Sequence, residues 1–212
     1  MTSGSRRVFI NCPFDDAYKP VFDALLFCVY DCGFAPASAL ERSDSGEVRF
    51  SKIMRLIQIC RFGIHDISRT ELDDDNGLPR FNMPFELGLF LGCRYADPRR
   101  PARKRCLILD REPHRYQKFL SDISGQDIRS HGHDPFVALA CVRDWLRSSS
   151  ADETIPGSDE IAERYRQFQR DLPELCRQLR LTPAKLTFVD RCLLIQRWLG
   201  KPAYSLVGRR LE

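Results

Sequence analysis

The chain has 212 residues, a length that suits one α/β domain with a small appendage. Its formal net charge of +4 is mild, whereas a dedicated nucleic-acid-binding domain usually carries a stronger and more clustered basic surface. The one basic cluster, between residues 99 and 118, is interpreted as a solvated loop beside a strand, with a phosphate-contacting patch as the alternative. Nucleic acid is therefore not an expected partner.

Membrane insertion and metal binding are not expected either. The longest apolar run, Ala24–Tyr30, is too short to span a bilayer, and no signal peptide is visible, which favours a cytoplasmic protein. The nine cysteines include no C-x-x-C pair, and no histidine or cysteine follows Cys28 and Cys32 at zinc-site spacing. We therefore predict buried, reduced thiols and no metal site.

Strands and helices alternate along residues 6–147. A buried strand is predicted over Arg7–Asn11, followed by a helix from Tyr18 to Cys32 that Gly33 ends. The alternation continues with strands at 34–40, 62–67, 106–110 and 127–130 and helices at 47–60, 82–95, 114–123 and 134–147. Such spacing is typical of βαβ units, so we expect a flavodoxin-like α/β fold with a parallel sheet and helices on both faces.

A second part of the chain follows a Ser-rich linker at 148–158. Two helices are predicted there, one at 159–179 with a kink at Pro173, and one at 183–199 with its cap at Thr182. We therefore divide the chain into an α/β domain at 6–147, the linker, and a helical appendage at 159–212. The second helix is apolar on more than one side, so it needs a partner besides the first helix.

Ligands of open parallel sheets bind at the carboxyl ends of the strands, where the strand order reverses. In a flavodoxin-like order this point lies between the first and third strands. Candidate substrate-binding residues at the strand ends and helix starts are Asn11, Phe14, Asp44, Ser45, Arg49, Asp66, Ser68 and Asn82. No G-x-S-x-G, Walker A or G-x-G-x-x-G motif is present, so hydrolase, P-loop and dinucleotide-oxidoreductase interpretations lack their usual support.

Several of these residues also have a purely structural interpretation. Asp44 and Ser45 fit an N-cap of the second helix, whose free N–H groups, with Arg49 one turn inside, are an alternative site for a phosphate. Asp66 fits an Asx-type turn or a helix cap as well as an acceptor for a ribose hydroxyl. Phe14 fits the core as well as a stack on a base.

Glu86 is the candidate reactive carboxylate. It is predicted in the first turn of the helix at 82–95, where the helix dipole alone favours a glutamate. Gly88 and Gly92 suggest that this helix packs closely onto the sheet, which would hold Glu86 rigidly. A rigid carboxylate among apolar neighbours suits N-glycosidic chemistry, because cleaving a base from ribose builds positive charge at the anomeric carbon.

Four segments resemble a bacterial group of TIR-like (Toll/interleukin-1 receptor-like) proteins, which are similar in turn to the nucleoside 2-deoxyribosyltransferases. The segments are V-F-I-N-C-P-F-D at 8–15, A-L-E-R-S-D-S-G-E at 39–47, I-H-D-I-S-R at 64–69 and R-F-N-M-P-F-E-L-G-L at 80–89. The resemblance implies that Glu86 is catalytic and that Asp66 contacts substrate. It also implies cleavage of NAD, as a substrate and not a cofactor, at the nicotinamide–ribose bond, in anti-phage defence or nucleotide signalling.

Three functions remain open. The first is an N-glycosidase of NAD or a related nucleotide, and the second is a nucleoside or nucleotide ribosyl hydrolase or deoxyribosyltransferase with a smaller substrate. The third is a non-catalytic nucleotide sensor or assembly module. An acidic loop at 71–75 is a candidate cover of the site, and its charge disfavours polyphosphates unless Arg49 and the basic cluster at 99–118 compensate. Because TIR-like enzymes commonly act as oligomers, the resemblance also implies a homo-oligomer, which we expect to depend on Leu186, Leu193 and Trp198.

Overall fold

The computed structural model describes residues 6–41, 44–72, 77–96 and 104–201. Its centre is one parallel sheet with the strand order β2-β1-β3-β4-β5. The strands are β1 (Arg7–Asn11), β2 (Ala35–Ala37), β3 (Phe62–Asp66), β4 (Arg105–Asp110) and β5 (Ile128–Ser130). This is the strand order of flavodoxin-like folds, so the expected fold class is confirmed.

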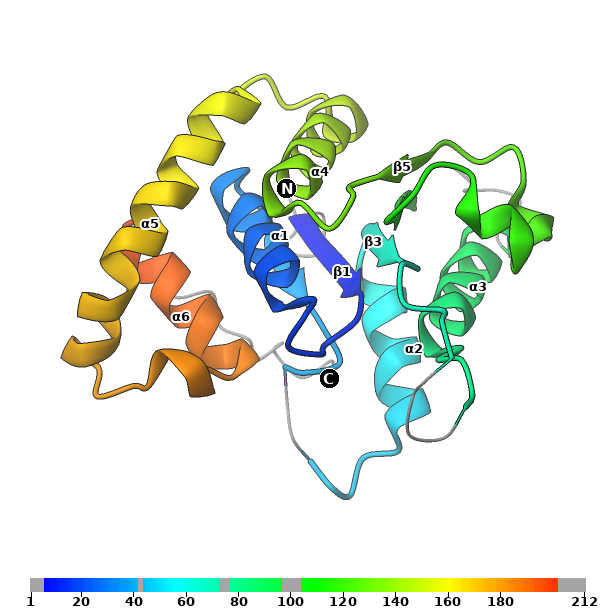
Figure 1. Cartoon of the computed structure of the whole chain (residues 1–212), viewed down its shortest axis with the longest axis horizontal. Coiled ribbons are helices and arrows are strands. Elements are labelled where there is room, and N and C mark those ends of the chain that lie inside the picture. Colours follow the sequence, from blue (N-terminus) through cyan, green and yellow to red (C-terminus); the bar gives the residue numbers. More distant parts are fainter. Residues whose placement is uncertain (1–5, 42–43, 73–76, 97–103, 202–212) are drawn as a thin grey trace, which may run out of the picture.

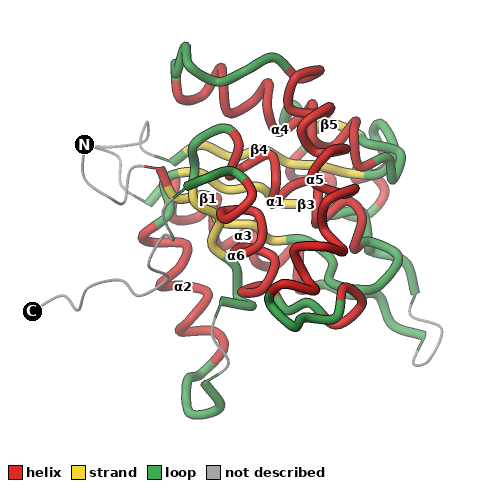
Figure 2. Tube along the Cα trace, turned by 90° about the vertical axis from the view of Figure 1, so that its left-hand side faces the viewer, coloured by secondary structure: helices red, strands yellow, loops and turns green. Residues whose placement is uncertain are grey.

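Helices cover both faces of the sheet (Figures 1 and 2). The helices α1 (Lys19–Asp31) and α4 (Pro135–Ser150) pack together on one face, while α2 (Arg49–Ile59) and α3 (Asn82–Tyr95) cover the other. The stretch after β4 forms two short 3-10 helices, η2 (Arg115–Lys118) and η3 (Ser121–Ile123), instead of the single helix expected there. Leu120 separates them, because its φ of −143° and ψ of 58° are not helical.

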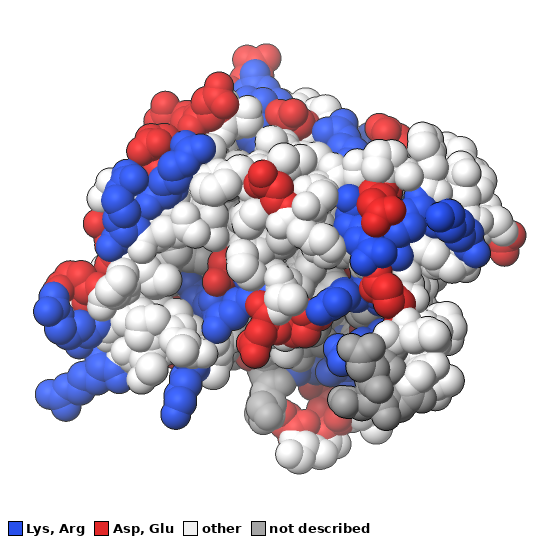
Figure 3. Space-filling model, in the orientation of Figure 1, with Lys and Arg blue, Asp and Glu red and all other residues white. Residues whose placement is uncertain are grey.

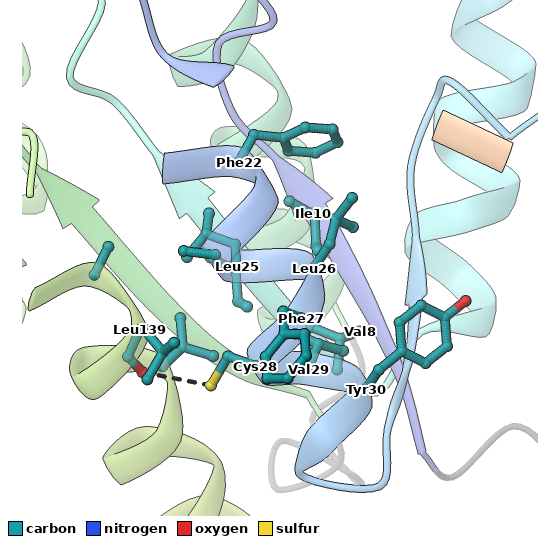
Figure 4. Packing of buried hydrophobic residues seen from close by; sticks show 14 of the residues in the cluster. Val8, Ile10, Phe22, Leu25, Leu26, Phe27, Cys28, Val29, Tyr30 and Leu139 are labelled. Atoms are coloured by element: carbon teal, nitrogen blue, oxygen red, sulfur yellow. Dashed lines mark hydrogen bonds between the residues drawn. The ribbon is translucent and has the colours of Figure 1, made fainter. Parts of the chain in front are cut away.

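Alternation along β1 links the two layers. Val8 and Ile10 belong to the core cluster that contains α1, whereas Phe9 belongs to the cluster with α2 and α3. Figure 4 shows the side chains of α1 packed between β1 and Leu139 of α4, whose carbonyl accepts a hydrogen bond from Cys28 Sγ at 3.4 Å. Because α1 is buried from Val21 to Asp31 except at Asp23, its outer side also needs a cover.

The C-terminal helices supply that cover. The helices α5 (Ser158–Gln178) and α6 (Phe188–Trp198) lie against α1, and their apolar side chains belong to the same core cluster as β1 and α4 (Figure 1). The Trp198 ring lies 5.7 Å from the Phe27 ring, and Gln196 donates to the Tyr30 hydroxyl at 3.1 Å. The second partner that the last helix needs is therefore the α/β part of the same chain.

Boundaries near the C-terminal helices differ from the sequence prediction. Helix α4 continues to Ser150, so the connection to α5 is shorter than expected. Residues 183–185 form only a 3-10 turn, η4 (Pro183–Lys185), and α6 begins three residues later. The cap is Thr187 instead of Thr182, because Thr187 and Asp190 form a capping box in which each side chain bonds the other's backbone N–H.

The start of α2 also differs. Val48 precedes the helix and makes no side-chain cap, so Asp44 and Ser45 are too far upstream to cap it. Asp44 Oδ1 instead accepts the Gly46 N–H at 2.9 Å within an exposed turn. The expected N-cap role of both residues is therefore wrong, and Asp44 stabilises the turn before the helix.

Candidate functional site

The carboxyl ends of β1 and β3 form the topological switch point of this sheet. Asn11 of β1 and His65 of β3 are register partners, but α1 follows β1 on one face and α3 follows β3 on the other. The connections after β1 and β3 therefore leave the sheet toward opposite faces, as they do at the ligand sites of other open parallel sheets. Polar side chains at these two strand ends and at the start of α3 are the ones that a ligand would meet.

Glu86 is the fifth residue of α3, which begins at Asn82, so it lies in the second turn and not in the first as expected. The residue is 6% exposed, and none of the described residues gives its carboxylate a hydrogen bond or an ion pair. Burial raises the pKa of Glu86 to about 7, against the opposing positive charge of Arg49. A buried carboxyl that exchanges its proton near neutral pH is typical of functional sites.

The pKa of the Cys12 thiol is influenced by several carboxylates. Its thiol is buried directly after β1, and burial, followed by the negative charges of Asp66, Glu86 and Asp15, raises its pKa well above the ordinary value. The thiol is therefore protonated and structural. Asp66 and Glu86 both contribute to this shift, although they come from different elements.

Asn11 ties α3 to the end of β1. Its Nδ2 donates to the Met83 carbonyl in the first turn of α3 at 2.9 Å and lies 3.1 Å from His65 Nδ1. Burial, and to a smaller extent the charge of Lys104, lowers the pKa of His65 to about 3, so the ring is neutral and Nδ1 accepts. Asn11 therefore positions the helix that carries Glu86, while its contact with a substrate remains a prediction.

Close packing of α3 onto the sheet comes from a different glycine than expected. A Cβ on Gly88 or Gly92 would meet nothing within 4 Å, so neither residue lies against the sheet. A Cβ on Gly63 of β3 would instead lie 2.7 Å from the Phe90 ring and 2.8 Å from His65 Nε2. Gly63 therefore makes room for α3, and the rigidity inferred for Glu86 has its source in β3.

Asp66 is a buried junction of four hydrogen bonds. Oδ2 accepts from the Tyr18 hydroxyl at 2.6 Å and from His131 Nε2 at 2.9 Å, and Oδ1 accepts from the Ser68 backbone N–H at 2.8 Å and from the Ser68 hydroxyl. His131 Nδ1 accepts from the His133 N–H at 3.1 Å, which leaves the proton on Nε2. Asp66 and Ser68 are both 0% exposed, so the turn interpretation describes their contacts, and a bond to ribose would require one of these bonds to open.

The loop between β1 and α1 presents an aromatic ring and an ion pair. Phe14 is 43% exposed and packs edge-on against Phe22 at 5.5 Å, so it belongs only partly to the core. Asp15 binds Arg69 through two bonds of 2.7 and 3.1 Å, and these bonds lower the pKa of Asp15. The Asp15–Arg69 ion pair therefore anchors this loop to the segment after β3.

The remaining candidates lie on the outside of the same edge. Asp44, Ser45 and Arg49 are exposed at and before the start of α2, and Asn82 is exposed as the first residue of α3. Only Arg49 has a recorded influence on Glu86, through its charge. Phosphate binding at this helix start remains a prediction.

The expected acidic loop is held by arginines where the structure describes it. Glu71 forms ion pairs with Arg111 and with Arg115, the latter at 3.7 Å. Arg115 also binds the buried Asp110 at 2.6 Å and the Ile67 carbonyl at 2.8 Å. The acidic residues at 73–75 lie outside the described residues.

Sequence reasoning missed Tyr18, His131, Arg69 and Arg115, which hold the three carboxylates at the strand ends. No local motif announces them, because each acts on a carboxylate from another part of the chain. The one usable signal was chemical: an aspartate that ends a buried strand needs donors from elsewhere.

The comparisons with known proteins add no relative. No protein-family model, no curated protein and no solved structure matches this chain. Within the described ranges, no helix is long and apolar enough to cross a membrane. No three His, Cys, Asp or Glu residues in those same ranges gather in a way that would hold a metal ion.

Proposed function

We propose that this protein cleaves an N-glycosidic bond of NAD or a related nucleotide, with Glu86 as the reactive carboxylate. The observation that carries the proposal is the environment of Glu86 in α3, the helix that Asn11 fastens to the end of β1. There it is 6% exposed, unpaired among the described residues, and has its pKa raised to about 7 by burial. Resemblance to TIR-like proteins adds NAD as the preferred substrate.

The chemistry needs a negative charge beside the anomeric carbon. As the C1′–N bond breaks, the base leaves with the bonding electrons and the sugar becomes cationic at C1′. An ionised Glu86 stabilises that cation or bonds to it, and water then adds to C1′ and releases a proton. Glu86, which none of the described residues bonds, is a stronger electrostatic stabiliser than Asp66, whose charge four hydrogen bonds already satisfy.

Fixed supports make this arrangement suitable for catalysis. Asn11 holds the first turn of α3, and the Gly63–Phe90 approach holds the middle of that helix. Glu86 lies between these two attachments along the helix. A carboxylate held in this way loses little freedom when a substrate binds.

The test is incubation of the purified protein with NAD and with a panel of nucleosides and nucleotides, followed by chromatography of the products. Free nicotinamide from NAD is the expected result. Free nucleobase from a nucleoside, without reaction of NAD, would favour the smaller substrate. Measurable binding without turnover of any compound would contradict the proposal and favour a sensor or assembly module.

A further inference from the structure

Phe14, one of the candidate site residues, lines a concave feature together with the C-terminal segment. A cleft of about 430 Å³ opens between the loop after β1 and the C-terminal segment 184–188, which joins η4 to α6. Lys19 Nζ donates to the Ala184 carbonyl at 3.2 Å and so connects the two walls. In Figure 3, basic and acidic side chains meet in the middle of this face, between the region of α6 and that of the β1–α1 loop. The volume falls in the range of small-molecule sites.

The floor of the cleft is aromatic. Phe22 and Phe188 are 5% and 4% exposed, and their ring centroids lie 6.2 Å apart. Phe14 contacts Phe22 through an edge and keeps 43% of its surface exposed at the rim. An exposed ring above an apolar floor suits stacking on a planar heterocycle.

The rim carries free charge of both signs. Lys185 and Asp16 line the cleft, and neither has a partner among the residues that the structure describes. The Lys19 ammonium donates one N–H to the Ala184 carbonyl, which leaves its other N–H groups for a ligand. Asp15 and Arg191 also line the cleft, but Arg69 and Asp23 already neutralise them. Two lysines and one free carboxylate therefore remain for a ligand.

We propose that this cleft binds a nucleoside 5′-phosphate, either free or as the uncleaved part of the substrate. The base stacks on Phe14, Asp16 accepts from the ribose hydroxyls, and Lys19 and Lys185 hold the phosphate. Inorganic phosphate alone would leave the aromatic floor empty, and a base alone would leave both lysines unused. The segment 184–188 thus forms one wall of a binding site, which gives the C-terminal helices a role beyond covering α1.

The cleft depends on the proposed function in one respect, because the cleft and the candidate site both use the loop after β1. The loop follows Asn11, which bonds the Met83 carbonyl in the helix that carries Glu86, and it reaches the cleft at Phe14. A nucleotide bound in the cleft therefore lies on the same edge of the sheet as Glu86. Binding in the cleft needs no reaction at Glu86, so the two proposals are separable.

The test is calorimetric titration of the Glu86→Gln protein, which keeps the ligand intact, with adenosine 5′-monophosphate, adenosine and inorganic phosphate. Adenosine 5′-monophosphate is expected to bind more tightly than either of the other two. Phe14→Ala should weaken that binding about tenfold. Lys185→Gln, which changes an exposed and unpaired side chain, should weaken it at least about threefold.

Matched controls are Tyr95→Ala and Lys118→Gln, which change an exposed aromatic ring and an exposed lysine that do not line the cleft. Equal affinity for the monophosphate and for phosphate alone would overturn the proposal, as would unchanged affinity in both cleft variants. NAD cleavage that survives unchanged in cleft variants with weakened monophosphate binding would support a free nucleotide in the cleft and overturn only its use for the uncleaved part of the substrate. Monophosphate binding without cleavage of any nucleotide by the wild-type protein would overturn the proposed function alone.

Discussion

The carboxylates of Asp66 and Glu86 lie in opposite environments. Asp66 has four hydrogen-bond donors and no exposed surface, whereas Glu86 is nearly buried without a described partner. Water stabilises an ionised carboxylate, and burial removes much of the water around Glu86. The loss of this water raises the pKa of Glu86 to about 7. The ionisation of Glu86 therefore changes near neutral pH.

Activity should rise with pH through the pKa of Glu86. Below about pH 7 the carboxyl is mostly protonated and cannot stabilise a cation, so kcat/KM should fall about tenfold per pH unit on the acid side. Above that pH the rate should level off. The measurement is a pH profile of initial rates, and a profile that is flat or falling between about pH 5.5 and about pH 7.5 would contradict a role for the ionised form.

Stability should respond to pH in the opposite sense. The folded-state pKa of Glu86 is raised from 4.5 to about 7, so its protonated form favours folding, and this contribution is lost as the pH rises through about 7. Glu86→Gln removes the cost of ionisation and should stabilise the protein by about 2–3 kcal/mol at about pH 8, with little effect at about pH 4.5. Urea unfolding at both values checks this. A variant less stable than wild type at the higher pH would mean that the carboxylate has favourable partners.

The position of α3 depends on residues of the strands β1 and β3. Gly63 lets Phe90 approach β3, and Asn11 fastens the start of α3 to β1. The ring of His65 packs against Phe90 at 4.8 Å and completes this support. The geometry of Glu86 is therefore set by residues of two strands and not by its own helix alone.

Gly63→Ala should destabilise the fold and displace Glu86. The new Cβ would lie 2.7 Å from the Phe90 ring, so helix or ring must shift, at a cost of about 1–3 kcal/mol. Gly88→Ala is the matched control, because a Cβ there meets nothing within 4 Å and alanine favours the helix by about 0.5–1 kcal/mol. Thermal unfolding and turnover of both variants are the measurements. Equal melting temperatures for the two variants would refute this account of α3.

The elements that could be predicted from sequence are those that a single pattern specifies. Helix α3 begins and ends where expected, and β1 matches because its apolar run is buried on both faces. The start of α6 was missed because capping depends on which N–H groups a hydroxyl meets, and both Thr182 and Thr187 fit the pattern. The partners of Asp66 were missed for a similar reason, since Tyr18 and His131 reach it only through the fold.

At the scale of the whole molecule, α5 and α6 belong to the core of the α/β domain. Leu186, Leu194 and Ile195 are buried in the cluster that also holds α1, and Trp198 packs against it. Of the three residues expected to support an oligomer, only Leu193 is exposed, at 42%. A homo-oligomer remains a proposal, but Leu186 and Trp198 already have partners within the chain.

Truncation after Ser150 should therefore prevent stable folding. The change removes the cover of α1 and exposes Phe27, which contacts Tyr165, Phe168 and Trp198 in the intact chain. Aggregated or unfolded protein is expected, because so large an apolar face is not stable in water. Light scattering and circular dichroism of both forms test this. A truncated protein that is folded and monomeric would show that the helical segment is a separate appendage.

The role of Glu86 as the reactive carboxylate can be tested by substitution. The most direct measurement compares NAD cleavage by wild type, Glu86→Gln and the control Glu153→Gln, which alters an exposed glutamate remote in sequence from the candidate site. We predict that Glu86→Gln lowers kcat/KM at least about a hundredfold while its melting temperature does not fall, and that the control matches wild type. A Glu86→Gln protein with activity within about tenfold of wild type, a loss below about 1.4 kcal/mol of barrier, would contradict the claim.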